Sequence, residues 1–241
     1  DDLWVSGELG SAALALVPDY RLAAKLNVAA ALATFAVAVT VLLDGARGGG
    51  DYLIVDELNI FFLLLNGLVG ATTSAFSAGY IGHEIATGKL TARLVRFYHA
   101  MFQAMMGAMN LALLANNIGL LWVGLEVATL ITVVMVGLYR TPAALEAAWK
   151  YFILGSVGIS LAFFGTILIY LAGQGALGQG TAAMTWSRLM GVAPKLDVAL
   201  LNLAFVFLLI GYGTKVGLAP LHAWLPDAHA EGPTPISAVL S

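Results

Sequence analysis

Two ionisable residues inside long apolar segments are the strongest candidates for chemistry in this sequence. Glu126 lies in the middle of the apolar run 120–128, and Lys215 lies at the end of the run 198–214. A charge costs about 2.5–3.5 kcal/mol at the centre of a bilayer, so such residues mark ion pathways and are expected to have partners. Burial disfavours the charged form of each group and pairing favours it, so making and breaking a contact between Glu126 and Lys215 would move a proton.

Each of these residues also has a purely structural interpretation. Glu126 could be a neutral glutamate or one hydrogen-bonded to a neighbouring helix, and Lys215 could extend from a helix end to the membrane interface. Pro220 and Pro226 favour the functional interpretation, because they follow the lysine closely and interrupt the helix beside it. Irregular backbone at membrane depth is tolerated where it lines a wet cavity, and broken helices form ion sites in this way. We therefore predict a proton site at a discontinuous helix.

Lys150 has two interpretations that the sequence supports equally. It lies four residues after Glu146, a spacing that suits a surface ion pair on a helix. Alternatively, the helix begins at Pro142, and Lys150 then lies about two turns inside the membrane.

Four ionisable residues cluster shortly after Lys215, and they are His222, Asp227, His229 and Glu231. Their spacing matches no metal-ligand pattern, so we expect a proton-access relay at the broken helix rather than a metal site. His83 and His99 flank a charged loop and are predicted to lie at the membrane interface.

The composition indicates an all-α, polytopic transmembrane helix bundle. Hydrophobic residues make up 60% of the 241 residues and charged residues only 10%, against about 25% in soluble globular domains. A net charge of −3 provides no basic surface for nucleic acid. The sequence contains no cysteine, which excludes zinc–thiolate sites, iron–sulfur ligation and disulfides. We therefore expect a lipid bilayer as the surroundings and no cofactor or metal in this chain.

The apolar segments predict six membrane-spanning helices in a single domain, residues 1–241. The expected spans are 22–43, 58–81, 97–115, 118–138, 149–172 and 198–218. Residues 3–17 are interpreted as the remnant of a first helix, and 235–241 as the start of the next segment. The chain is therefore expected to be the N-terminal part of a longer protein.

The distribution of Lys and Arg predicts the orientation of the helices. One side of the membrane receives seven basic residues and the other three. The seven are Arg21, Lys25, Lys89, Arg93, Arg96, Arg140 and Lys150, and the three are Arg47, Arg188 and Lys195. The side with seven is predicted to be cytoplasmic, as is the loop after Lys215. We expect a multi-pass protein of the inner (plasma) membrane.

Two segments resemble a known family of membrane proteins. Residues 215–241, KVGLAPLHAWLPDAHAEGPTPISAVLS, resemble the signature of the antiporter-like subunits of respiratory complex I, Mrp-type cation/proton antiporters and membrane-bound hydrogenases. Residues 98–155, which begin YHAMFQAMMGAMNLALLANN, look most like hydrogenase-4 component F. The resemblance covers essentially the whole chain, but only about the first half of a full family member.

The resemblance implies roles for the candidate residues. In the family, a glutamate on helix five pairs with a lysine on the discontinuous helix seven. Glu126 and Lys215 match these positions if 3–17 counts as helix one. Lys150 matches the lysine on helix six, which places it in the proton path. The family's next lysine and its second half would lie beyond Ser241.

We predict a proton-translocating membrane subunit of a redox-driven complex, of the hydrogenase-4 or NADH:quinone oxidoreductase type. Glu126 would tune Lys215, Lys150 would relay the proton and His222 would assist at the access side. The resemblance implies other antiporter-like subunits and a hydrophilic redox arm as partners, which would hold the metal and flavin cofactors. The alternatives are an Mrp-type sodium/proton antiporter subunit and, from another class, a structural scaffold without ion conduction.

Overall fold

The computed structural model describes residues 17, 19–45 and 48–240, and this part of the chain is almost entirely helical. The helices are α2 (Tyr20–Asp44), α3 (Glu57–Ala86), α4 (Ala92–Leu114), α5 (Ile118–Val136), α6 (Pro142–Leu177), α7 (Trp186–Val192), α8 (Val198–Val216), α9 (Leu225–Glu231) and α10 (Thr234–Leu240). Two short strands, β1 (Gly48–Gly49) and β2 (Ile54–Val55), pair antiparallel. The predicted helix remnant at 3–17 lies outside the described residues except for its last residue.

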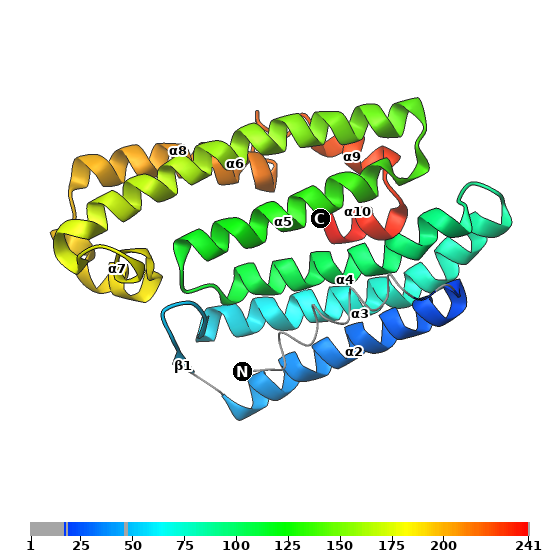
Figure 1. Cartoon of the computed structure of the whole chain (residues 1–241), viewed down its shortest axis with the longest axis horizontal. Coiled ribbons are helices and arrows are strands. Elements are labelled where there is room, and N and C mark those ends of the chain that lie inside the picture. The colour runs from blue at the N-terminus through cyan, green and yellow to red at the C-terminus, as the bar shows by residue number, and fades with distance from the viewer. Residues whose placement is uncertain (1–16, 18, 46–47, 241) are drawn as a thin grey trace.

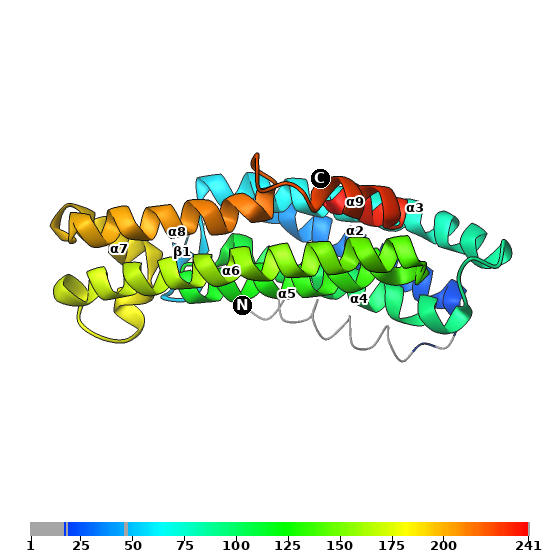
Figure 2. The same ribbon diagram turned by 90° about the horizontal axis from the view of Figure 1, so that it is seen from above.

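Figure 1 shows the long helices in a row, in the order α2, α3, α4, α5 and α6, and Figure 2 shows that α3 lies at the level of α8 and α9, whereas α4, α5 and α6 lie at another level. The view from above shows α8 and α9 stacked on α6 (Figure 2). The most extensive helix–helix contacts join α6 to α8, α2 to α3 and α4 to α5. The predicted polytopic helix bundle is therefore confirmed.

Five stretches are long and apolar enough to cross a membrane, and they are Tyr20–Asp44, Glu57–Ala86, Ile118–Tyr139, Pro142–Leu177 and Val198–Val216. They correspond to five of the six predicted spans. The sixth prediction, 97–115, forms the helix α4, which does not reach this level of apolarity. Figure 1 shows α4 in the middle of the row, and it contacts α2, α3 and α5, so its polar side chains can face other helices instead of lipid.

The helix around Lys150 begins at Pro142 and is longer than the predicted span 149–172. The Thr141 hydroxyl accepts a hydrogen bond from the Ala144 amide at 3.0 Å, so Thr141 caps the helix start. Proline suits the first helical turn because its missing N–H would have no partner there. Lys150 therefore lies two turns along α6 from its N-terminus, as one of the two interpretations predicted.

The helix break after Lys215 lies halfway along the bundle and not at its end. α8 stops at Val216, two residues before the predicted end at 218, because Gly217 adopts a left-handed φ of 73°. Figure 1 shows α8 and α9 arranged end to end along α6. The prediction of a cytoplasmic loop after Lys215 is therefore wrong: α9 starts at Leu225, has Pro226 in its first turn and continues along α6.

Candidate functional site

Glu126 on α5 and Lys215 in the last turn of α8 form the centre of the candidate site. The two side chains are close enough for their charges to interact. Glu126 Oε2 and Lys215 Nζ are both buried, and neither has a hydrogen-bond partner in the described structure. Buried polar atoms of this kind are rare in proteins and are usually satisfied by water or by a mobile partner. The structure thus brings together the two residues that the sequence singled out.

Tyr151 of α6 forms one wall of this site. The Lys215 ammonium lies 5.9 Å from the centre of the Tyr151 ring, within the range of a cation–π interaction. The Tyr151 hydroxyl lies 2.8 Å from Thr132 Oγ1 on α5, so the ring position is fixed by two helices. Nothing in the sequence distinguishes Tyr151, since aromatic residues occur throughout the apolar segments.

Trp224 caps the broken helix. Its indole Nε1 donates to the Thr214 carbonyl at 2.8 Å, and its ring stacks on Tyr151 with centroids 4.3 Å apart. The last carbonyls of a helix lack intrahelical partners, and leaving them buried and unpaired is unfavourable. Trp224 is therefore a structural part of the break that the sequence analysis missed. The sequence contained one signal for it: Trp224, whose ring is apolar but carries an N–H donor, lies between Pro220 and Pro226.

Glycines bring α6 and α8 into direct backbone contact just before Lys215. A Cβ added to Gly211 would lie 2.5 Å from the Ala162 backbone nitrogen and 2.6 Å from the Gly158 carbonyl oxygen. A Cβ on Gly158 would lie 2.7 Å from the Thr214 Cβ atom. Small residues permit this close packing between membrane helices. The approach fixes the depth of Lys215, because Gly158 lies near the middle of α6.

Lys150 lies outside the central pair and forms a bridge on the surface. Its Nζ is 2.8 Å from Glu146 Oε1 and 2.8 Å from Asp227 Oδ2, and its side chain is 47% exposed. The i,i+4 pair with Glu146 was one of the two interpretations of the sequence. The contact with Asp227 was not predicted, and it ties α6 to the helix that follows the break.

His222 lies in the unwound segment between α8 and α9. Its side chain is exposed and makes no hydrogen bond or ion pair with the described residues. His222 and the other three ionisable residues of this segment do not form a cluster. Asp227 pairs with Lys150, and the described residues contain no group of three His, Asp or Glu that could hold a metal. His222 therefore lies near the helix break but forms no hydrogen bond or ion pair with Glu126 or Lys215.

His99 is buried inside the protein, and its predicted position at the membrane interface stays a prediction. It is fully enclosed between α2 and α4, against the rings of Tyr20 and Tyr98 at centroid distances of 6.0 Å and 5.2 Å. Both of its ring nitrogens lack hydrogen-bond partners in the described structure. The last residues of the charged loop predicted before His99, 92–96, form the first turn of α4, which begins at Ala92. His99 therefore lies about two turns along α4, where the side chains of neighbouring helices cover it.

Comparison with known proteins identifies the family. Residues 115–241 match the family described as "NADH:quinone oxidoreductase/Mrp antiporter, TM". The chain belongs to this family. It is 55% identical, over 97% of its length, to a "Hydrogenase-4 component F homolog" of Methylacidiphilum infernorum, of which it covers 49%. It is 32% identical, over 83% of its length, to "NADH-quinone oxidoreductase subunit N 1" of Sorangium cellulosum, of which it covers 38%. The chain thus spans half or less of these relatives.

Solved structures share the fold. A chain of the archaeal membrane-bound sulfane sulfur reductase superimposes with a TM-score of 0.80 at 21% identity, covering 98% of this chain and 48% of that one. Respiratory complex I from Thermus thermophilus gives 0.75 at 23% identity, with 98% and 51% covered. The Mrp complex from Dietzia gives 0.78 at 19% identity, with 98% and 44% covered. The helix arrangement is therefore that of this family.

Proposed function

We propose that this chain is part of a proton-translocating membrane subunit in a redox-driven complex of the hydrogenase-4 or NADH:quinone oxidoreductase type. The observation that carries the proposal is the pair of buried, unpartnered charged atoms at a helix break halfway along the bundle. Ionisable residues at such depth are retained where they handle ions. The similarity to proteins named hydrogenase-4 component F and NADH-quinone oxidoreductase subunit N supports the choice of complex.

The site supports a simple exchange at Lys215. When Glu126 is charged and close, it stabilises the protonated lysine, and when the pair separates, burial favours release of the proton. Tyr151 and Trp224 hold the broken end of α8 in place during this exchange. In this proposal Lys150 passes the proton on, through a rearrangement of its contact with Asp227 next to the helix break, and His222 assists at the access side.

The redox chemistry would reside in other subunits. We infer as partners further antiporter-like membrane subunits and a hydrophilic arm of nickel–iron hydrogenase or quinone oxidoreductase type. The chain would bind no cofactor itself and would lie in the inner (plasma) membrane. The absence of cysteine in this sequence agrees with this division of roles.

The test uses the full-length protein in its complex, reconstituted in vesicles. Glu126→Gln and Lys215→Ala are each expected to abolish redox-driven proton uptake while the complex remains assembled. The matched control is Glu146→Gln, a carboxylate whose side chain is 67% exposed, which should retain uptake. Full pumping by both Glu126→Gln and Lys215→Ala would overturn the proposal and favour a structural scaffold.

The alternative is an Mrp-type sodium/proton antiporter subunit, which the family description and the fold of the Dietzia complex favour. It predicts exchange of sodium for protons without an electron donor. It also predicts that the full-length protein purifies without a hydrogenase or quinone-reducing module.

A further inference from the structure

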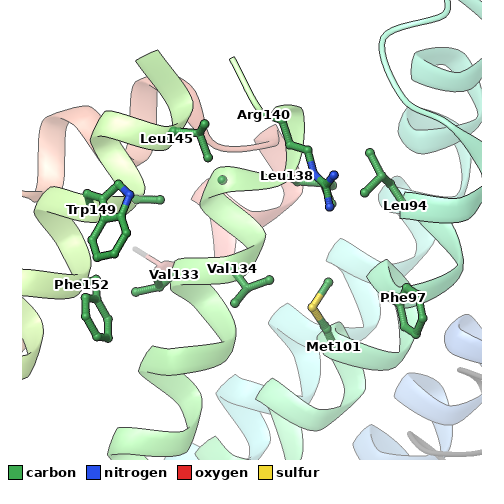
Figure 3. A pocket seen from close by; sticks show the side chains of 12 residues that line it. Leu94, Phe97, Met101, Val133, Val134, Leu138, Arg140, Leu145, Trp149 and Phe152 are labelled. Carbon is green, nitrogen blue, oxygen red and sulfur yellow. The ribbon is translucent and has the colours of Figure 1, made fainter. Parts of the chain in front are cut away.

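An apolar cavity of about 600 Å³ lies between α4, α5 and the start of α6 (Figure 3). Its lining residues come from all three helices and from the 3-10 turn η1 (Gly137–Tyr139), and they are Leu94, Phe97, Met101, Val133, Val134, Gly137, Leu138, Arg140, Leu145, Ala148, Trp149 and Phe152. All of them except Arg140 present carbon-rich surface. The volume is in the range of pockets that hold small molecules or part of a larger amphiphile.

The cavity opens at the surface of the helix bundle. Val134 and Trp149, on opposite walls, are 58% and 61% exposed. Both lie in stretches that are long and apolar enough to cross a membrane. An opening of this kind faces the hydrocarbon of a bilayer, so an acyl chain can enter it directly.

Arg140 is the one charged group of the lining. Its side chain makes no ion pair and no hydrogen bond in the part of the chain that the structure describes. Arg140 is exposed, and Figure 3 shows its guanidinium beside Leu94, above Met101. Arg140 also has a left-handed φ of 54°, the only positive φ among the described residues other than glycine. Such a conformation is unfavourable for a side chain with a Cβ and often marks a functional position.

The charge at this end of the bundle fits an anionic headgroup. Arg140 lies on the side of the membrane with seven basic residues against three, which the distribution predicts to be cytoplasmic. Anionic lipids concentrate in the cytoplasmic leaflet and attract basic residues near its surface. A guanidinium binds the oxygens of a phosphate with two parallel hydrogen bonds, and in an anionic phospholipid no choline ammonium offsets the phosphate charge.

We propose that this cavity binds one anionic phospholipid, with an acyl chain between α4, α5 and α6 and the headgroup phosphate on Arg140. The site is separate from the buried pair of Glu126 and Lys215, and it would anchor the junction of α5 and α6 at the membrane surface. It requires neither proton translocation nor a particular parent complex.

The test uses Trp149 as a reporter in the full-length protein, purified in its complex and reconstituted in phosphatidylcholine vesicles. Phosphatidylglycerol or phosphatidylcholine with brominated acyl chains is added, and the quenching of tryptophan fluorescence is measured. The part of the quenching that is lost in Trp149→Phe comes from Trp149 and is assigned to the cavity. Brominated phosphatidylglycerol should quench Trp149 at about fivefold lower mole fraction than brominated phosphatidylcholine, as expected from about 1 kcal/mol per basic residue near an anionic surface.

Arg140→Gly removes the charge and is expected to keep the backbone conformation at this position. Glycine accepts the φ of 54° without strain, so the variant should fold, and it should quench equally with both lipids. Arg188→Gln at the other end of the bundle is the control and should keep the preference. Equal quenching by both lipids in the wild type, an unchanged preference in Arg140→Gly, or no quenching of Trp149 at all would each overturn the proposal.

Discussion

Apart from Glu84 Oε2 on α3, the buried side-chain atoms that lack hydrogen-bond partners among the described residues lie in two regions of the bundle, which differ in kind. In the first, α5, α6 and α8 enclose the charged residues Glu126 and Lys215 beside a broken helix. In the second, α2, α3 and α4 enclose the neutral residues Asn27, Ser74 and His99, which are all fully buried in continuous helices. The first is called the charged region and the second the neutral region.

The neutral region is held together by hydrogen bonds between side chains of different helices. Gln103 on α4 donates to the side chain of Asn27 on α2 at 2.8 Å, and also to its backbone carbonyl at 3.0 Å. Asn66 on α3 donates to Asn110 on α4 at 2.7 Å. Bonds of this kind contribute about 1 kcal/mol each between membrane helices. The neutral region therefore uses polarity to join helices.

The charged region uses polarity differently. Its helices are joined by glycine contacts and by the stacking of Tyr151 on Trp224, while the charged atoms remain unpartnered. An unwound segment follows Lys215 directly, so backbone polar groups reach the same depth as the charge. In the charged region, the packing between helices and the unpartnered charged pair therefore depend on different residues. A substitution can change the packing without removing a charge.

The largest effect on stability is expected for Gly211→Ala. The new Cβ would meet backbone atoms at 2.5 Å and 2.6 Å, which cannot move like a side chain, so α6 and α8 must separate. Overpacking of this kind costs about 1–3 kcal/mol, and we expect the upper end. Thermal unfolding of the purified full-length protein in its complex measures the change.

Two glycines of the neutral region are the controls for this substitution. Gly67→Ala would place its Cβ 3.2 Å from Phe35 Cα and should have a smaller effect. Gly79→Ala meets nothing within 4 Å and should be neutral or stabilising, since alanine favours helix by up to about 1 kcal/mol. Equal losses for Gly211→Ala and Gly67→Ala would contradict the difference in packing between the two regions.

The second effect is expected for Trp224→Phe, which keeps the aromatic ring and removes the indole N–H. The Thr214 carbonyl at the break loses its 2.8 Å bond and retains only a weak contact from the Gly217 amide at 3.4 Å. An unsatisfied buried acceptor costs about 1–3 kcal/mol, here nearer the lower limit. We also expect faster amide hydrogen exchange between residues 217 and 224.

Trp122→Phe is the matched control for the helix break. Trp122 also donates an indole N–H to a carbonyl at 2.8 Å, but that carbonyl belongs to Ile159 in the middle of α6. In a continuous helix this oxygen already accepts a backbone hydrogen bond, so removing the indole donor does not leave it unpaired. Trp122→Phe should therefore lower the stability less than Trp224→Phe. If Trp122→Phe destabilised the protein as much as Trp224→Phe, the capping role of Trp224 would be wrong.

The central pair could be predicted from the sequence because charges are conspicuous in apolar runs. Glu126 and Lys215 each stand alone in a stretch that must be apolar to cross a bilayer, so their type and position were sufficient. The helix spans followed from the same rule, with errors mainly at the ends. The structure extends α6 back to Pro142 because the cap at Thr141 is a local signal that hydropathy does not record.

The depth of the break could not be predicted in this way. Pro220 and Pro226 indicate that a helix is interrupted, but the direction of the chain afterwards depends on its packing against α6. Tyr151 and Trp224 were missed for a related reason, because their roles arise from contacts between segments far apart in the sequence. The burial of His99 was missed because the charged stretch before it was interpreted as a loop up to residue 96, whereas α4 already begins at Ala92.

The third prediction concerns His99→Phe in the neutral region. Phenylalanine has a similar shape, fits between the rings of Tyr20 and Tyr98, and removes two buried nitrogen atoms that lack partners. Replacing unsatisfied polar groups by apolar groups of the same shape is nearly neutral or stabilising, so we expect a change within about 1 kcal/mol. Redox-driven proton uptake in vesicles should be retained. A loss of uptake as complete as that of Lys215→Ala would instead place His99 in the proton path.

The smallest effect is expected for Asp227→Asn, which removes the contact between α9 and Lys150. The two side chains are 42% and 47% exposed, so water and salt screen the pair and its loss should lower the unfolding temperature only slightly. Glu146→Gln removes the other partner of Lys150 at the same distance of 2.8 Å and is the control. Both variants should be equally stable, but if Lys150 relays protons toward the break, only Asp227→Asn should slow proton uptake. Equal rates in the two variants would restrict Lys150 to a surface ion pair and leave the charged region with Glu126 and Lys215 alone.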